Sequence, residues 1–402
     1  MKFFAKASII SISKPRRMLF RTLIVAASLL FALLVVELVL RVLCMVDPRR
    51  SSTIQEQLER SRNSSMNDAQ GEVSMRGLIQ PSANSEIVYE AKPGLKGLFR
   101  GKPFSINRFG MRGEDYNLEK PPGMFRIAGL GDSVMFGWGV DQNDFYLKVL
   151  ERKLNELPQP HPRYEVMNFA LPGYNTYMEV AAFEEKALPF HPDLVIIQFV
   201  NNDFGIPHFM LRPPDPFTLE KSFLWELIAT RRGWISSDDE QNLIGDRLEG
   251  LDMKKKRQVV APYWHMVGPR GYRRAMEKLA ALTRPLNIPV IILRGSYSEQ
   301  QGQIINHIAT AQGFHLLDIG PYSESVLSEM GLTDEEKANR ALLWVGPGDH
   351  HPNALGHEIY VVGLLDKMAE MGVIPQSTSH DSKGPDFSVP LSGSGSDEVS
   401  VP

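Results

Sequence analysis

Cysteine is almost missing from this sequence of 402 residues, in which Cys44 is the single example. One thiol excludes an intramolecular disulfide and leaves no metal site built from cysteines. The 10 histidines form no His-x-x-x-His pattern on a plausible helix. We therefore expect no metal ion and no other cofactor.

An excess of charge of either sign is also missing, because the formal net charge is only −3. No basic face stands out, so nucleic acid is not an expected partner. The one tight basic run in the body of the chain, residues 254–257, is more typical of a solvated patch than of a binding site. Hydrophobic residues at 43% and charged residues at 23% are ordinary for globular proteins. Length alone leaves one large domain or two ordinary ones open.

Long uncharged runs occur only near the N-terminus. Residues 1–21 carry several lysines and arginines but no acidic residue, and residues 22–46 are apolar apart from Glu37 and Arg41. This stretch approaches the ~20 residues that cross a bilayer. Glu37 and Arg41 stand four apart, so they can pair on one helix face near a membrane interface. The basic residues favour a cytoplasmic N-terminus with the rest of the chain outside.

Two other processing routes compete with this predicted single-pass anchor. A cleaved signal peptide requires small residues after its apolar core, and none follow here. A lipoprotein signal requires a small residue before Cys44, where Leu43 stands instead. The sequence therefore favours an uncleaved anchor, and cleavage is the alternative.

Composition changes mark the remaining boundaries. We expect a polar linker or stalk over 47–86, a folded domain over 87–374 and a disordered tail over 375–402, which is rich in Ser, Gly, Asp and Pro. Residues 204–263 contain several prolines, an apolar helix-like segment and an acidic run, and they do not fit a simple crossover. We interpret them as an insertion near the site, whose aromatic residues either contact a substrate or pack the insertion onto the domain.

Strand and helix patterns alternate through the body of the chain. Short apolar runs predict buried strands at 127–130, 166–169, 194–200, 290–293 and 315–319. Helical spacing predicts helices at 145–157, 176–188, 272–286 and 354–371. This alternation is typical of an α/β domain with a parallel sheet.

The first three predicted strands each end in residues that carry chemistry. Gly131-Asp132-Ser133 follows the first, Gly173 lies after the second and Asn202 after the third. The carboxyl ends of parallel strands meet at one edge of a sheet, where free N–H groups at helix starts favour negative charge. On its own, Gly-Asp-Ser is equally well explained as a plain turn with a helix cap.

The far end of the chain supplies what a serine nucleophile needs. Asp349 and His351 stand two residues apart in a Gly/Pro-rich loop ahead of the last helix. A histidine takes the proton of an attacking serine, and a carboxylate fixes the tautomer of that histidine. His350 is a neighbouring candidate for the base.

Four blocks in this order resemble the SGNH hydrolases, also called the GDSL esterase/lipase family, in a membrane-anchored bacterial form. They are Gly131-Asp132-Ser133, residues 168–176, residues 199–203 and residues 349–357, and the resemblance covers roughly 104–371. It implies a flavodoxin-like three-layer α/β/α sandwich around a parallel sheet of about five strands. Two positions depart from the family pattern: Val200 stands where the family has glycine, and the family's usual Asp–His spacing of three would place the acid at Gly348.

The resemblance also implies roles for individual residues. Ser133 would attack an ester carbonyl, and His351, chosen over its neighbour by the His-Pro-Asn match, would take the proton while Asp349 orients it. The oxyanion would be held by the backbone N–H groups of Ser133 and Gly173 and by the side-chain amide of Asn202.

These roles imply a serine esterase or deacylase acting outside the cytoplasm on an O-acyl ester of an envelope glycan or lipid. An O-acyltransferase that passes the acyl group to a sugar hydroxyl would use the same triad and is the first alternative. A non-catalytic binding protein of the envelope is the second.

Overall fold

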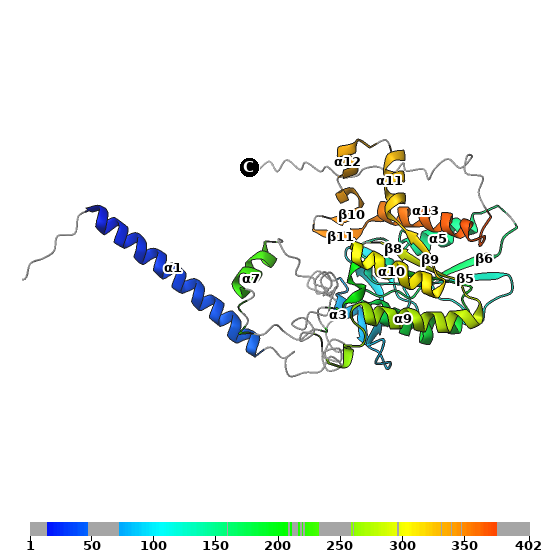
Figure 1. Cartoon of the computed structure of the whole chain (residues 1–402), viewed down its shortest axis with the longest axis horizontal. Coiled ribbons are helices and arrows are strands. Elements are labelled where there is room, and N and C mark those ends of the chain that lie inside the picture. The colour runs from blue at the N-terminus through cyan, green and yellow to red at the C-terminus, as the bar shows by residue number, and fades with distance from the viewer. Residues whose placement is uncertain are drawn as a thin grey trace, which may run out of the picture.

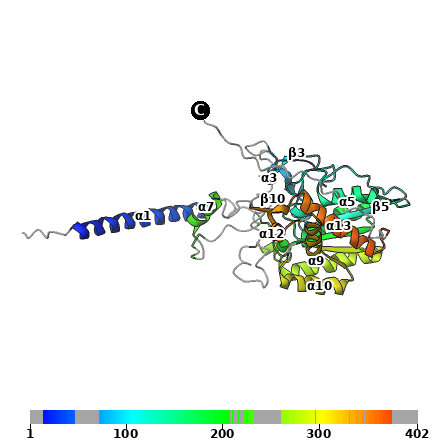
Figure 2. The same ribbon diagram turned by 90° about the horizontal axis from the view of Figure 1, so that it is seen from above.

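In the computed structural model, a long N-terminal helix extends from an α/β domain (Figures 1 and 2). The structure describes residues 14–46, 72–158, 160–207, 210, 216, 217, 219, 222–232, 259, 261–295, 297–330, 332–338, 340–346 and 348–375. The first 13 residues, most of the predicted linker, much of the predicted insertion and the tail from residue 376 lie outside this description.

A five-stranded parallel sheet forms the centre of the domain. Its order is β6-β5-β7-β8-β9. The strands are β5 (Met124–Leu130), β6 (Arg163–Asn168), β7 (Leu194–Phe199), β8 (Val290–Arg294) and β9 (His315–Asp318). In chain order this is 2-1-3-4-5, the doubly wound arrangement of flavodoxin-like folds. The predicted fold class and the number of strands are confirmed.

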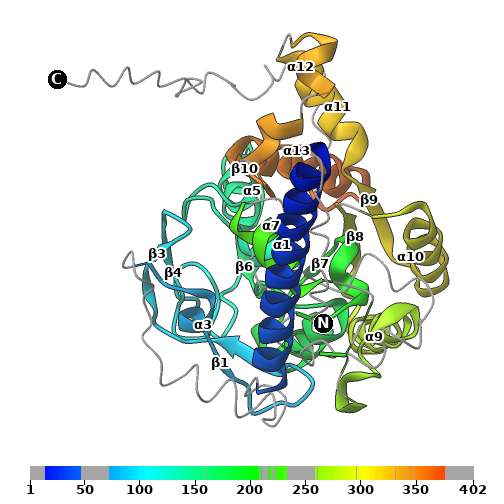
Figure 3. The same ribbon diagram turned by 90° about the vertical axis from the view of Figure 1, so that its left-hand side faces the viewer.

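Helices cover both faces of the sheet (Figures 1 and 3). One face packs against α5 (Tyr146–Asn155), α11 (Gly320–Glu329) and α13 (Ala354–Glu370), and the other against α6 (Thr176–Ala182), α9 (Gly268–Thr283) and α10 (Glu299–Gln312). Alternate residues of each strand enter opposite cores: Ile196 lies in the first, while Val195 and Ile197 lie in the second. The near-continuous apolar strands of the sequence follow from this burial on both sides.

The segment before the sheet packs onto the first core. It comprises α3 (Met75–Leu78), the antiparallel pair β1 (Ile79–Pro81) and β2 (Tyr89–Ala91), and the hairpin β3 (Lys96–Phe99) and β4 (Lys102–Ser105). Val73, Leu78 and Ile79 are buried. The folded domain therefore includes residues from at least Val73, so the predicted boundary at residue 87 is too late. The few apolar side chains before residue 87 were missed because the residues around them are mostly polar.

The N-terminal helix α1 (Lys14–Met45) contains the predicted anchor. Its stretch Met18–Met45 spans 28 residues, and an 18-residue window within it has a mean hydropathy of 2.9 and is not buried by the rest of the chain. Length and composition make it a candidate membrane span or signal sequence. One helix of the predicted insertion, α7 (Phe223–Arg231), lies beside it (Figure 1).

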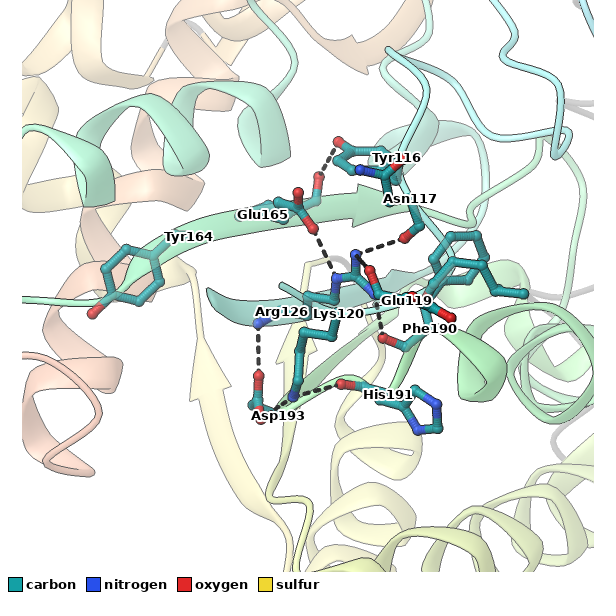
Figure 4. A network of polar contacts seen from close by, with 12 residues as sticks. Tyr116, Asn117, Glu119, Lys120, Arg126, Tyr164, Glu165, Phe190, His191 and Asp193 are labelled. Carbon is teal, nitrogen blue, oxygen red and sulfur yellow. Dashed lines mark hydrogen bonds and ion pairs between the residues drawn. The ribbon is translucent and has the colours of Figure 1, made fainter. Parts of the chain in front are cut away.

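Arg126 organises the amino edge of the sheet, away from the strand ends that carry the predicted site (Figure 4). Its fully buried guanidinium pairs with Glu165 at 2.7 Å and donates to the carbonyls of residues 117, 118, 119 and 190. Its backbone N–H donates to Asp193. A buried cation with every donor engaged is tolerated, and here it ties β5, β6 and the start of β7 together.

Candidate active site

Ser133 follows β5 at the point where the strand order of the sheet reverses. The crossover after β5 leads to β6 on one side, and the crossover after β7 leads to β8 on the other, so the two diverge between the carboxyl ends of β5 and β7. The chain turns sharply into α4 (Ser133–Phe136), and the Asp132 side chain caps this helix by accepting from the N–H of Val134 at 2.9 Å. A β-carbon at Gly131 would lie 2.7 Å from the Met135 β-carbon, so only glycine fits this turn.

The carboxyl end of α4 is held by Arg112, a residue whose role the sequence did not reveal. Its buried guanidinium donates to the carbonyls of Phe136, Gly137 and Val140. A cation there complements the helix dipole and satisfies carbonyls that the short helix leaves open. Burial lowers the pKa of Arg112 to about 9, with Asp141 and Asp144 opposing, so the side chain remains charged at pH 7.

His351 and Asp349 lie on a hairpin, β10 (Trp344–Gly346) paired with β11 (Asp349–Pro352), not on the predicted irregular loop. In a strand, residues two apart share a face, so the unusual spacing places both side chains toward Ser133. His350 packs against the Trp344 ring, with centroids 4.1 Å apart.

These three side chains form one continuous hydrogen-bonded chain. Ser133 Oγ lies 2.8 Å from His351 Nε2, and His351 Nδ1 lies 2.6 Å from Asp349 Oδ1. The carboxylate selects the tautomer with hydrogen on Nδ1, which leaves Nε2 to accept from the serine hydroxyl. The backbone N–H of His351 also donates to Asp349 Oδ1, at 3.2 Å.

The second oxygen of Asp349 is engaged by Trp138. The indole N–H donates to Oδ2 at 3.0 Å, and the indole ring stacks on the imidazole of His351 with centroids 5.0 Å apart. Burial raises the pKa of Asp349, but the hydrogen bonds from His351 and Trp138 and the charge of His351 outweigh it and lower the pKa to about 2. Asp349 is therefore ionised throughout the range in which a histidine base works.

Trp138→Phe is expected to lower kcat/KM for an ester roughly tenfold, about 1.4 kcal/mol, because the ring stays while one charge-assisted hydrogen bond to Asp349 is lost. The measurement is kcat/KM against pH, together with the midpoint of thermal unfolding. Phe99→Leu is the matched control, since Phe99 packs edge-on against Trp138 without touching Asp349. Equal losses in both variants would show that only packing matters.

The two other predicted oxyanion groups lie at the ends of the neighbouring strands. Gly173 has a φ of +80°, and a β-carbon there would lie 2.8 Å from the Tyr89 hydroxyl, so both conformation and space require glycine. Asn202 is the second residue of the short turn Asn201–Phe204 after β7, and it donates from Nδ2 to Asp132 Oδ2 at 2.9 Å. This bond fixes the amide plane beside the serine turn and leaves the second amide hydrogen available for a ligand.

Asn202→Ala is expected to reduce kcat about 10²- to 10³-fold with little change in KM, because a donor aimed at developing charge acts mainly in the transition state. Asn201→Ala, in the adjacent position of the same turn, is the control. A rise in KM without a fall in kcat would contradict an oxyanion role for Asn202.

A cluster of buried acids supports this turn. Asp203 accepts from the N–H of Val200 at 2.7 Å and from the Thr176 hydroxyl at 2.6 Å. Both carboxylate oxygens of Glu179 are buried without a hydrogen-bond partner among the described residues. Burial, together with the charge of Asp132, raises the pKa of Glu179 and of Asp203 well above the usual range. The described residues contain no group of three or more His, Cys, Asp or Glu arranged to hold a metal ion.

His357, in the last of the four blocks, joins the closing helix α13 to the start of α5. Its Nδ1 accepts from the N–H of Tyr146 at 3.2 Å, and the two rings stack. Burial lowers the pKa of His357 to about 3, helped by the positive charges of Arg112 and His351. The folded protein therefore holds this ring neutral.

The stability of the domain should depend on pH through His357. The unfolded chain takes up a proton near pH 6.5 and the folded chain only near pH 3, so stability falls as pH decreases between these values, by up to about 1.4 kcal/mol per pH unit. Denaturant unfolding from pH 7 to pH 4 measures this slope, and His357→Asn should make it shallower. The exposed His307 provides the control, His307→Asn, which should leave the slope unchanged.

One protein-family model matches the part of the chain that carries this candidate site. The model of the GDSL-like lipase/acylhydrolase family matches residues 130–359, a stretch that begins at the end of β5 and includes Ser133, Gly173, Asn202, Asp349 and His351. A search of curated proteins found no match.

Several solved structures are similar in part. A catalytic variant of an acetylxylan esterase from Geobacillus stearothermophilus is 17% identical, with a TM-score of 0.37, covering 61% of this chain and 94% of that one. A protein from Desulfitobacterium hafniense described as a putative lipolytic protein of the G-D-S-L family is 14% identical, with a TM-score of 0.34, covering 60% and 97%. TesA is 12% identical, with a TM-score of 0.36, covering 61% and 99%.

Proposed function

We propose that Ser133 is the nucleophile of this chain, which belongs to the GDSL-like lipase/acylhydrolase family because the family model matches more than half of it. The chain is thus an enzyme that acts on ester bonds. His351 is the general base and Asp349 orients and stabilises the imidazolium. The observation that carries this assignment is the unbroken chain of hydrogen bonds from Ser133 Oγ through His351 to Asp349.

The reaction follows from the positions of these groups. Ser133 Oγ bonds to the ester carbonyl carbon while its proton passes to His351 Nε2, and the carbonyl oxygen gains the negative charge. The N–H groups of Ser133 and Gly173 and the amide of Asn202 stabilise that charge. The bond from carbon to the ester oxygen then breaks, and the alcohol leaves with the proton from His351. Water, activated by His351, releases the acid from the acyl-enzyme.

The proposed place of this chemistry is the outer side of a membrane. The basic residues ahead of α1 favour a cytoplasmic N-terminus, and the apolar stretch Met18–Met45 is long enough to span a bilayer. The domain that follows would then act in the extracytoplasmic space. O-acyl esters of an envelope glycan or lipid are the substrates within its reach.

An O-acyltransferase differs only in what attacks the acyl-enzyme, a sugar hydroxyl in place of water. The triad is the same for both reactions, so the deciding quantity is the fate of the acyl group. Hydrolysis remains the proposal because the family to which the chain belongs is one of acylhydrolases.

A panel of p-nitrophenyl esters from acetate upward, with purified full-length protein in detergent, tests the proposal. We expect turnover in the wild type, none above background in Ser133→Ala, and a preference for one range of acyl lengths. Acetylated glycan fragments and acetylated lipids then serve as substrates, and unacetylated glycans as acceptors. Acyl groups recovered on the glycan instead of in water would replace the hydrolase by the transferase.

A further inference from the structure

The two charged residues within the apolar part of α1 bind the start of another helix. From residue 22 to residue 45, the charged residues are Glu37 and Arg41, and they form an ion pair of 2.7 Å. Glu37 also accepts from the N–H groups of Phe223 and Leu224, at 3.1 and 2.8 Å, and from the Ser222 hydroxyl at 3.0 Å. A carboxylate of α1 thus caps the nine-residue helix α7.

Arg41 strengthens the same junction from its other side. One guanidinium nitrogen donates to the carbonyl of Pro216 at 2.6 Å, and the guanidinium lies 5.0 Å from the centroid of the Phe223 ring. A charge in an apolar helix is costly in a membrane unless it finds such partners. Four donors converge on Glu37: Arg41 Nε, the Ser222 hydroxyl and the N–H groups of Phe223 and Leu224. Together with Arg41, Glu37 therefore connects two segments about 180 residues apart, and we call this set of contacts the joint.

Helix α7 exposes three large apolar side chains. Trp225 is 58% exposed, and Leu227 and Ile228 are each 39% exposed. The side chains of α1 are exposed in the same way along most of its length. Figures 1 and 2 show α7 beside the carboxyl-terminal half of α1, on the side of the domain from which α1 extends. Two helices in contact with each other, both with exposed apolar side chains, suit a lipid interface.

The depth of the joint follows from helix geometry. Glu37 lies 16 residues after Arg21, or roughly 24 Å along the helix axis at 1.5 Å per residue. That distance is close to the ~30 Å thickness of a hydrocarbon core, so the joint lies near the outer interface when Arg21 lies near the inner one. Tryptophan is typical of this depth, and arginines such as Arg231 and Arg232 at the end of α7 suit the head-group region.

We propose that α7 is a second membrane-contacting element, held flat at the outer bilayer interface by Glu37 and Arg41 of an α1 that is retained in the mature protein. The inference rests on the proposed membrane location and adds to it the lipid interface as the partner of α7. Helix α7 follows the Asn201–Phe204 turn in the sequence, after Ile206 and Met210, which are buried in the domain core. The joint therefore links the part of the chain that follows Asn202 to the membrane surface, which favours esters presented there.

The test uses full-length protein in nanodiscs of phosphatidylethanolamine and phosphatidylglycerol. A Trp225→Cys substitution in a Cys44→Ser background gives a single thiol, which is alkylated with a water-soluble maleimide. We expect alkylation at least tenfold slower in nanodiscs than in detergent-free unfolded protein in urea. Adding Glu37→Gln, which weakens the cap, should speed alkylation in nanodiscs about fivefold or more. Glu277→Gln, on the exposed face of α9, is the matched control and should have no effect.

The outcomes separate this inference from the proposed function. Mass spectrometry of the membrane-bound protein establishes whether residues 1–46 are present, and p-nitrophenyl ester hydrolysis on the same sample reports the Ser133 chemistry. Fast alkylation with α1 retained and activity intact would overturn the α7 proposal alone. A mature protein that lacks α1 would overturn both the anchor and the α7 proposal, while leaving the esterase chemistry in place. An unchanged slow rate in Glu37→Gln would overturn the role of the cap.

Discussion

Ser133→Ala is expected to lower kcat/KM for an ester by about 10⁶-fold, the scale on which loss of a serine nucleophile acts in other triad enzymes. The methyl group cannot form the acyl-enzyme, while the N–H groups that surround the oxyanion remain. KM for a substrate that still binds should change little. The measurement is initial rates with an activated ester at substrate concentrations on both sides of KM. The midpoint of thermal unfolding is measured beside it, to show whether losing the Ser133 hydrogen bonds to Asp132 and His351 affects the fold.

A cysteine variant gives a sharper control than alanine. Ser133→Cys keeps a nucleophile at the same place, so it should gain alkylation by iodoacetamide at residue 133, told apart from Cys44 by peptide mass spectrometry, while losing most turnover. Residual hydrolysis in Ser133→Ala that equals the wild type would mean that a different group attacks the ester.

Asp349→Asn is expected to lower kcat by about 10⁴-fold, the second-largest effect. The carboxylate accepts from His351 Nδ1 with one oxygen and from the Trp138 indole with the other. An amide has only one accepting oxygen, so either the indole or the imidazole then faces an N–H group. If the amide nitrogen faces Nδ1, the hydrogen moves to Nε2 and the ring can no longer take the proton of Ser133.

The readout of this prediction is kcat against pH together with the unfolding midpoint. In the wild type, the Asp349 pKa of about 2 keeps the carboxylate charged, so it adds no inflection above pH 4. The matched variant Trp138→Phe in the Asp349→Asn background should cost little more than Asp349→Asn alone, because the charge-assisted bond is already gone. Additive losses would show that Trp138 acts independently of Asp349.

The positions of the main groups were predictable because they follow strands. Apolar runs predicted all five strands of the sheet, and Ser133, Gly173 and Asn202 lie in the connections that follow the first three. Because both faces of the sheet are buried, these strands are nearly continuous apolar runs, which can be recognised in a single sequence. The side chains that follow these strands then lie close together, and this does not depend on the exact course of the connecting helices.

The hairpin that carries the proposed acid and base was harder to foresee. Glycine and proline around Asp349 and His351 predicted an irregular loop, and the family's usual spacing pointed to Gly348. The antiparallel pairing of β10 with β11 depends on contacts between the two strands, which a local pattern does not contain. Once the segment is a strand, a spacing of two becomes the one that aligns both side chains.

Other contributors had no local signal at all. Trp138 is fully buried beside Phe99 and reads in the sequence as core, although it also binds Asp349. Arg112 is buried, and the carbonyls that it binds lie 24 or more positions away in the chain. Glu179 is also buried, and its carboxylate has no hydrogen-bond partner among the described residues. Residues 72–86 look like stalk because their few apolar side chains are separated by polar ones. Such roles emerge only from tertiary packing.

The central claim is that Ser133, activated by His351, forms the acyl-enzyme, and covalent labelling tests it most directly. Full-length wild type, Ser133→Ala and His351→Ala are incubated with a fluorophosphonate, and the adduct is located by peptide mass spectrometry. The account predicts one adduct on Ser133 in the wild type, none in Ser133→Ala, and labelling slower by 100-fold or more in His351→Ala. An adduct on another residue, or equally fast labelling of Ser133 without His351, would contradict it.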